Sequence, residues 1–316
     1  MSDDTSLELP FPYRRNPHQA QAVAHHQEWL LRHRELAATT GEFTYAHWEV
    51  AELAALSYPD CSAADLGLAT DLLGFYFLFD DQFDGPLGRR PEQVARICER
   101  LSAIIHGARP DGNSPVERAF ADLWRRSVQG MSSRWRARAA YNWEWYFASH
   151  PSEAAGRLST EIPDRQSYLM LRRGTAAMET IFDMIERLGR FEVPQAVLHH
   201  PLLRQLRQLA ADIPSLSNDV RSYPQEAPRG DVCNLVLIVQ KERACSPEEA
   251  ASVVIAEAQE MVDHFARLSI ELPQAYHWLE LDQPQREAAQ RYADGLARWL
   301  AGYLYWEGRT GRYRAA

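Results

Sequence analysis

The residues best suited to chemistry are three aspartates in the segment FYFLFDDQFDGP, residues 75–86: Asp80, Asp81 and Asp84. Spacings of three and four residues place side chains on one face of a helix, and the glycine–proline pair that follows ends that helix. Three negative charges at the negative end of a helix dipole repel one another unless a cation is bound. Carboxylate oxygens favour Mg²⁺ or Mn²⁺, and Mg²⁺ often shares its ligands with a substrate phosphate.

A second set of oxygen-bearing side chains occurs in NDVRSYPQE, residues 218–226. Asn218, Ser222 and Glu226 recur every four residues, so a helix stacks their side chains along one side. This pattern predicts a tridentate oxygen site for a metal ion. A polar helix face that leads into a loop is the alternative interpretation of this motif alone. Two such motifs beside apolar residues in one chain favour the metal interpretation for both.

The elements that position these motifs are helical by composition, because the chain between its prolines and glycines is rich in Ala, Leu, Glu, Arg and Gln. Strand-like alternation is almost absent, and the Val- and Ile-rich run at 232–239 is interpreted as a buried helix. Ser114-Pro115 and Ser246-Pro247 each predict a helix start, with a capping serine before a proline. The prediction is one all-α domain over residues 1–316, with about eleven helices. The expected segments are Pro17–Leu36, Tyr45–Leu56, Ala63–Phe83, Glu92–Ile105, Pro115–Gly130, Arg134–Ala148, Arg165–Leu188, Pro201–Ser222, Val232–Glu242, Pro247–Ile270 and Pro284–Trp306.

Charge and composition exclude several classes of protein. The 316 residues carry a formal net charge of −9, so no basic field is available for a nucleic-acid backbone. The four cysteines lie far apart and form no CxxC pair, which argues against zinc and against disulfides. No apolar stretch is long enough to span a bilayer, and the N-terminal MSDDTSLELP has acids where a signal peptide has basic residues. We therefore expect a cytoplasmic protein without integral membrane association.

Taken together, the two motifs resemble those of bacterial class I terpene synthases: DDQFD is similar to the aspartate-rich motif and NDVRSYPQE to the Asn/Ser/Glu triad. The resemblance covers essentially the whole chain. FLFDDQFDGP, FADLWRR (120–126) and GRFEVP (189–194) resemble the pentalenene-synthase type of sesquiterpene cyclase. This resemblance implies an α-bundle around an apolar cavity, three Mg²⁺ ions with Mn²⁺ as a substitute, and an isoprenyl diphosphate substrate. Farnesyl diphosphate and a sesquiterpene hydrocarbon or alcohol are expected, with geranylgeranyl diphosphate as the alternative substrate.

The resemblance also implies roles for individual residues. Asp80, Asp81 and the Asn/Ser/Glu triad bind the metals, and Asp84 orients the aspartate helix. RRGTAA, residues 172–177, is similar to the family's RRxTxG segment. In that alignment Arg173 senses diphosphate, Ala176 is the linker and the carbonyl of Ala177 faces the leaving group. Arg312 and Tyr313 resemble the terminal pair that hydrogen-bonds diphosphate when the site closes.

Aromatic side chains are expected to wall the cavity and to stabilise a carbocation through their π faces. Tyr76 and Phe77 lie one helical turn before Asp80, and Phe182 lies on the helix that carries Arg173. Leu296, Trp299, Tyr303 and Trp306 form one stripe on the last helix. A stripe of this kind is often plain core. Its place just before the terminal Arg-Tyr pair resembles the family's pocket wall.

The chain departs from the family pattern at three positions. Pro224 lies within the second motif, where a proline ring should kink or end the helix. Gln225 stands where the family often has a lysine that contacts diphosphate. Ala177 replaces the usual glycine.

Other functions fit the sequence less well. A chain-elongating prenyltransferase usually has two aspartate-rich motifs, and a class II cyclase has a DxDD acid that this chain lacks. A non-catalytic helical protein that binds an isoprenoid or another lipid gives no reason for two metal motifs together with the arginines. Helical faces for a dimer and for the core look alike, so a monomer and a homodimer both remain open.

Overall fold

The computed structural model describes residues 7–38, 45–159 and 161–313. Within these ranges it is helical and contains no strand, so the predicted all-α fold is confirmed. Residues 1–6, which include the N-terminal acids Asp3 and Asp4, lie outside the described residues. No helix in the described ranges is both long and apolar enough to cross a membrane.

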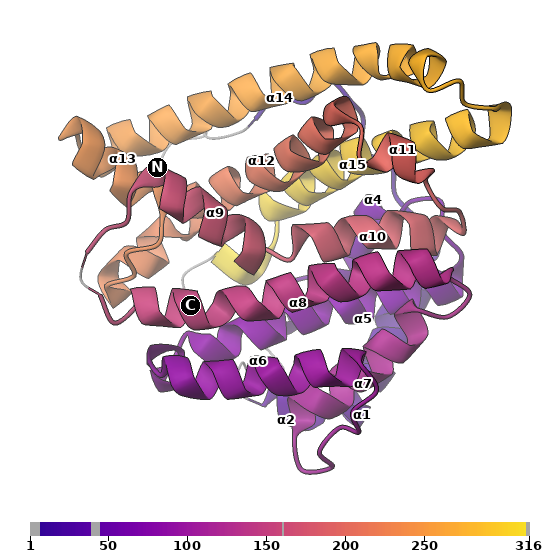
Figure 1. Cartoon of the computed structure of the whole chain (residues 1–316). Coiled ribbons are helices and arrows are strands. Elements are labelled where there is room, and N and C mark those ends of the chain that lie inside the picture. Colours follow the sequence, from indigo (N-terminus) through magenta and orange to yellow (C-terminus); the bar gives the residue numbers. More distant parts are fainter. Residues whose placement is uncertain (1–6, 39–44, 160, 314–316) are drawn as a thin grey trace.

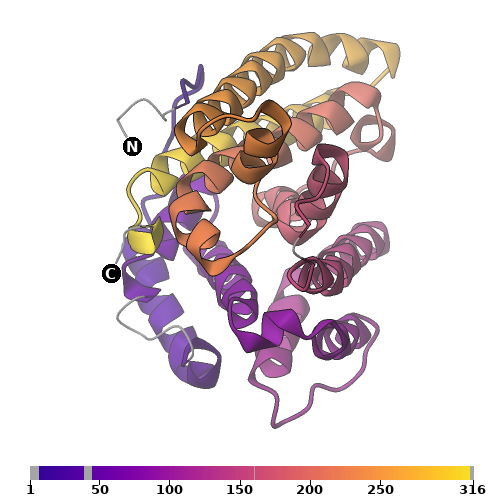
Figure 2. The same cartoon turned by 90° about the vertical axis from the view of Figure 1, so that its left-hand side faces the viewer.

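The long helices run roughly parallel or antiparallel across the molecule (Figure 1), and several of them are seen nearly end-on in the view turned by 90° (Figure 2). The α-helices are α1 (Gln19–Arg32), α2 (Arg34–Ala37), α4 (Val50–Ser57), α5 (Ala63–Asp80), α6 (Pro91–Ile105), α7 (Pro115–Ser127), α8 (Ser133–Gly156), α9 (Arg165–Thr175), α10 (Met178–Gly189), α11 (Gln195–Leu198), α12 (Pro201–Glu226), α13 (Leu235–Arg243), α14 (Pro247–Trp278) and α15 (Gln283–Glu307). Short 3₁₀ turns follow α5, α12 and α15.

Helix starts follow local chemistry. Ser114 and Ser246 cap α7 and α14 through their hydroxyls, and each is followed by a proline at the first helical position, as predicted. Ser246 also forms a reciprocal capping box with Glu249. Asn234 caps α13, so the Val- and Ile-rich run is a helix.

Most predicted segments match one helix, but Pro17–Leu36 is divided into α1 and α2, and Arg165–Leu188 into α9 and α10. The chain breaks at Ala177, whose φ of 58° is left-handed, and α9 and α10 lie on either side of it. A second difference concerns Pro224, because α12 does not end there but continues to Glu226.

The core joins both motif-bearing helices to the rest of the bundle. The aromatic and aliphatic side chains of α5 are buried along nearly its whole length, which explains its uniformly apolar sequence. α12 packs against α14 and α15, while α5 packs against α1 and α4. A smaller cluster, formed by α9, α12, α13 and α14, holds the C-terminal half of α12. The two motifs are therefore carried by rigid, well-packed helices.

Candidate active site

The aspartate motif lies at the C-terminal end of α5. Ser62 caps the first turn of this helix, and the chain tightens into a 3₁₀ turn at Asp81–Phe83. Asp80, Asp81 and Asp84 all line one cavity of about 780 Å³. The predicted gathering of three acids is thus present at the helix end.

The second motif faces the first across the same cavity. Asn218, Ser222 and Glu226 on α12 line it together with Asp219. Asn234, the cap of α13, donates to the Asp219 carbonyl and to Glu226 Oε2, both at 2.9 Å. These two hydrogen bonds hold the last turn of α12, and Glu226 lines the cavity although Pro224 precedes it.

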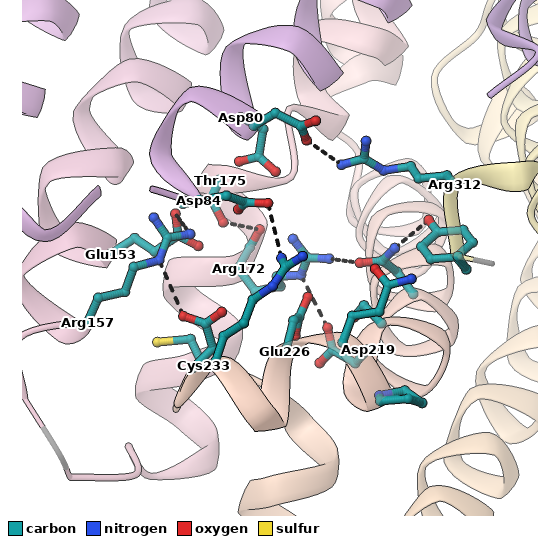
Figure 3. Close-up of a pocket in the computed structure, with 18 of the residues that line it drawn as sticks. Asp80, Asp84, Glu153, Arg157, Arg172, Thr175, Asp219, Glu226, Cys233 and Arg312 are labelled. Atoms are coloured by element: carbon teal, nitrogen blue, oxygen red, sulfur yellow. Dashed lines mark hydrogen bonds and ion pairs between the residues drawn. The ribbon is translucent and has the colours of Figure 1, made fainter. Parts of the chain in front are cut away.

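The two motifs and a set of arginines line the same polar part of the cavity, which we call the mouth. Figure 3 shows five of its residues, namely Asp80, Asp84, Arg172, Glu226 and Arg312. Their roles as metal ligands stay predictions. Within the described residues, no group of three His, Cys, Asp or Glu side chains forms a preassembled metal site.

The donor set nevertheless fits hard cations. All of the motif side chains offer oxygen, and the Ser222 hydroxyl is buried beside the Glu226 carboxylate, whose pKa it lowers. Oxygen donors of this kind are the ligands that Mg²⁺ and Mn²⁺ prefer. Burial, reinforced by Asp80 and Asp81, raises the pKa of Asp84 to about 6. Burial, followed by the nearby Asp219, raises the pKa of Glu226 to about 7. A bound cation would favour the ionised form of both carboxyls.

Two aspartates of the first motif form ion pairs with arginine side chains. Arg312 Nη2 lies 2.9 Å from Asp81 Oδ1, and Asn218 Nδ2 donates to the Tyr313 hydroxyl at 2.6 Å. Arg229, just beyond α12, contacts Asp84 at 3.3 Å. The predicted terminal pair therefore lies at the same mouth as both acidic motifs.

The two adjacent arginines of α9 point to different places, and the one expected to sense diphosphate points away from the cavity. Arg173 does not line this cavity; its guanidinium pairs with both oxygens of Asp212, at 2.8 and 2.7 Å. Arg172 lines the cavity instead, and donates to Asn218 Oδ1 at 2.7 Å. Burial alone would lower the pKa of Arg172, but Tyr168 and Asp219 raise it, so it stays charged. Of the two, only Arg172 lines this cavity.

The helix break does not support the predicted role of Ala177 either. Its carbonyl accepts bonds from Thr180 Oγ1 at 2.7 Å and from the Ile181 N–H at 3.1 Å, both in α10. That carbonyl therefore serves the first turn of α10. Thr175, two residues earlier, lines the cavity.

The predicted aromatic wall lies in the core below the mouth. Phe182, Trp299 and Trp306 are at most 2% exposed and, with Tyr76, belong to the main hydrophobic cluster. Phe77 is partly exposed and stacks on Trp306, with ring centroids 5.5 Å apart. None of these five side chains lines the polar cavity, so their contact with substrate stays a prediction.

Sequence reasoning missed Arg172 and Trp48, which both line the cavity. The spacing of α9 held the signal for Arg172: Tyr168, Arg172 and Thr175 are four and three residues apart, which places them on one face. Arg173 falls on a different face of that helix. Trp48 precedes a short helix and belongs to no motif, so the sequence offered no comparable signal.

Comparison with known proteins identifies the class. Residues 71–264 match the family described as "Terpene synthase family 2, C-terminal metal binding". The chain therefore belongs to the terpene synthase family, and it is a class I terpene synthase. The resemblance to bacterial enzymes of this class is confirmed.

Particular relatives are similar along the whole chain. The structure of germacradien-4-ol synthase from Streptomyces citricolor is 66% identical, covers 98% of this chain and 100% of its own, and superposes with a TM-score of 0.92. Pentalenene synthase from Streptomyces avermitilis is 34% identical, over 100% of this chain and 94% of the relative. A (−)-β-caryophyllene synthase from Saccharothrix espanaensis, named as cyclizing (2E,6E)-farnesyl diphosphate, is 35% identical over 98% of this chain and 89% of the relative.

Proposed function

We propose that this class I terpene synthase ionises farnesyl diphosphate in the presence of Mg²⁺ and cyclises the resulting cation to a germacradien-4-ol-type sesquiterpene alcohol. The observation that carries the proposal is the cavity itself, which two acidic motifs face from opposite helices. The 66% identity to germacradien-4-ol synthase, over 98% of the chain, supports the chain length and the alcohol. Three ions are expected, and Mn²⁺ is a substitute.

The residues proposed to hold the ions are Asp80 and Asp81 on one side and Asn218, Ser222 and Glu226 on the other. Bound Mg²⁺ supplies positive charge that stabilises the leaving diphosphate. Asp84, paired with Arg229, orients the aspartate turn.

The arginines of the mouth are proposed to bind the diphosphate oxygens. Arg172 and Arg312 carry planar guanidinium groups, which donate parallel hydrogen bonds to phosphate oxygens. Their positive charge stabilises the negative charge that develops as the carbon–oxygen bond breaks. Arg229 lies one turn beyond Gln225 and supplies the positive charge that this glutamine does not.

The aromatic residues below the mouth are proposed to shield the cation. Phe77 stacks on Trp306, and these rings are proposed to offer their π faces to the hydrocarbon tail and to exclude water from it. An alcohol forms when one water attacks the final cation and a proton is lost from its oxygen. The diphosphate released in the first step is the proposed acceptor of that proton.

A substrate panel tests the proposal. Purified protein is incubated with geranyl, farnesyl and geranylgeranyl diphosphate, with Mg²⁺ or with EDTA, and the extracts are analysed by gas chromatography–mass spectrometry. The expected result is a fifteen-carbon cyclic alcohol that forms from farnesyl diphosphate with Mg²⁺ and does not form with EDTA. When the incubation is repeated in water labelled with heavy oxygen, the alcohol is expected to carry the label. A cyclic product from geranylgeranyl diphosphate only would make the chain a diterpene cyclase. An unlabelled hydrocarbon would overturn the alcohol.

A further inference from the structure

The C-terminal segment is docked on a short stretch that the sequence did not mark as functional. The carbonyl of Trp48 accepts two hydrogen bonds, from Trp306 Nε1 at 2.7 Å and from Thr310 Oγ1 at 3.0 Å. The next residue along the segment, Gly311, donates its N–H to the His47 carbonyl at 2.9 Å. A Cβ at Gly311 would lie 2.9 Å from both Cβ and O of His47, so only glycine fits this approach.

The side chain of Trp48 supports Arg312. The guanidinium carbon of Arg312 lies 4.4 Å from the Trp48 ring centroid and 4.7 Å from that of Phe77. Both distances are within the range of a cation–π contact. The Trp48 ring is itself held edge-on against Phe77 and packs on Tyr45, with centroids 6.0 and 5.0 Å away.

Tyr45 in turn is anchored to the bundle. Its hydroxyl lies 2.8 Å from His26 Nε2, and His26 Nδ1 lies 2.8 Å from the fully buried Asp71 on α5. Asp71 also receives Arg126 at 2.7 Å. This chain of contacts gives the Trp48 ring a fixed base on helices α1 and α5, away from the mouth.

We propose that Trp48 is a positioning residue for Arg312, and that it raises the affinity of the mouth for a diphosphate group. This inference rests on the proposed function, because it assigns a purpose to the diphosphate contact of Arg312. An arginine side chain has large rotamer entropy, and a ligand must immobilise it before two parallel hydrogen bonds form. Trp48 removes much of that cost in advance: its ring lies against the guanidinium, which also pairs with Asp81, and its carbonyl accepts the side-chain hydrogen bond of Thr310, two residues before Arg312.

Three variants test the inference with inorganic diphosphate and Mg²⁺ as the probe. Trp48→Leu removes the ring, Arg312→Gln removes the charge, and the third variant combines them. Isothermal titration calorimetry measures each dissociation constant. Loss of one cation–π contact is expected to weaken binding by ~3- to 30-fold in Trp48→Leu. The ring acts through Arg312, so Trp48→Leu is expected to cause no further loss in the Arg312→Gln background.

Controls separate positioning from a general loss of fold. Trp278→Leu removes a tryptophan that is 82% exposed on α14 and should leave the affinity unchanged. Trp48→Phe retains a π face and is expected to recover most of the affinity. Thr310→Val keeps the ring but removes one anchor of the segment, and should weaken binding with little change in the circular-dichroism melting curve. It also tests the inference if Trp48→Leu fails to fold.

Two results would overturn the inference: wild-type affinity in both Trp48→Leu and Thr310→Val, or an equal loss from Trp48→Leu with and without Arg312. These outcomes are distinct from failure of the proposed function. The probe carries no isoprenyl group, so the coupling between Trp48 and Arg312 can be measured even if farnesyl diphosphate is not the substrate.

Discussion

The adjacent residues Arg172 and Arg173 should give opposite phenotypes when each is changed to glutamine. Arg172 faces the cavity and touches Asn218, whereas Arg173 clamps α9 to α12 through Asp212. The two substitutions are chemically identical and one residue apart in sequence. They therefore form a matched pair that separates binding of diphosphate from structural pairing.

The magnitudes follow from what each guanidinium contacts. Arg173→Gln leaves the Asp212 carboxylate, whose side chain is only 6% exposed, without its two charged hydrogen bonds. A hydrogen bond to a charged group contributes about 1.5–3 kcal/mol, and the glutamine can retain part of the contact. We expect a loss of about 2 kcal/mol in the free energy of unfolding and a melting temperature about 3 °C lower. Turnover at room temperature should change only a few-fold, because Arg173 does not line the cavity.

Arg172→Gln should instead lower turnover. Removing one preorganised donor to a developing negative charge costs about 100- to 1,000-fold in kcat. Asp219 keeps the hydroxyl of Tyr168 and the N–H of Leu235 as donors, so the fold should survive. The assay combines diphosphate release, product analysis and thermal melting followed by circular dichroism. Loss of turnover in Arg173→Gln with an unchanged melting curve, together with an active Arg172→Gln, would refute the assignment and restore Arg173 as the diphosphate contact.

Other substitutions probe the remaining parts of the account. Asp80→Asn and Asn218→Ala should each abolish turnover and leave the helical circular-dichroism signal intact; near wild-type activity in both would remove the metal assignment. Trp306→Ala should destabilise the fold by about 3–5 kcal/mol, because the side chain is fully buried, and should change the product distribution; an unchanged product profile would remove Trp306 from the aromatic wall. Metal affinity should rise between about pH 6 and about pH 8, since metals bind carboxylates after the proton is lost. The raised pKa of Glu226, about 7, keeps it protonated at the lower end of that range. Calorimetry in two buffers should detect the released proton, and a flat pH profile would contradict this.

The fold was largely predictable because its signals are local. Good helix formers, capping serines and N1 prolines set where most helices begin, and the Val- and Ile-rich run was rightly assigned to a buried helix, α13. The break at Ala177 was not predictable from propensity, since alanine is a strong helix former and the left-handed φ of 58° is imposed by packing. At Pro224 the sequence predicted a kink or an end of the helix, but α12 continues to Glu226. Asn234 and the smaller core cluster hold this last turn in place.

The site was predictable where chemistry and periodicity coincide. Asp80 and Glu226 lie on separate helices 146 positions apart by their numbering, yet each belongs to a helix-spaced set of oxygen donors that marks it in the sequence. Which of Arg172 and Arg173 faces the cavity depends on how α9 is rotated about its own axis, and a motif alignment alone does not give that rotation. Trp48 acts through a main-chain carbonyl and a ring contact made across the tertiary structure, and neither has a sequence pattern.

The central claim is that metal-dependent departure of diphosphate starts a cyclisation in this cavity. The most direct measurement incubates the wild-type protein with farnesyl diphosphate and quantifies released diphosphate and cyclic fifteen-carbon product in the same sample. We predict equal amounts of the two with Mg²⁺, and neither with EDTA or in Asp80→Asn. Tight binding of farnesyl diphosphate without Mg²⁺, with no diphosphate released when Mg²⁺ is added, would contradict the account and indicate a binding protein built on this fold.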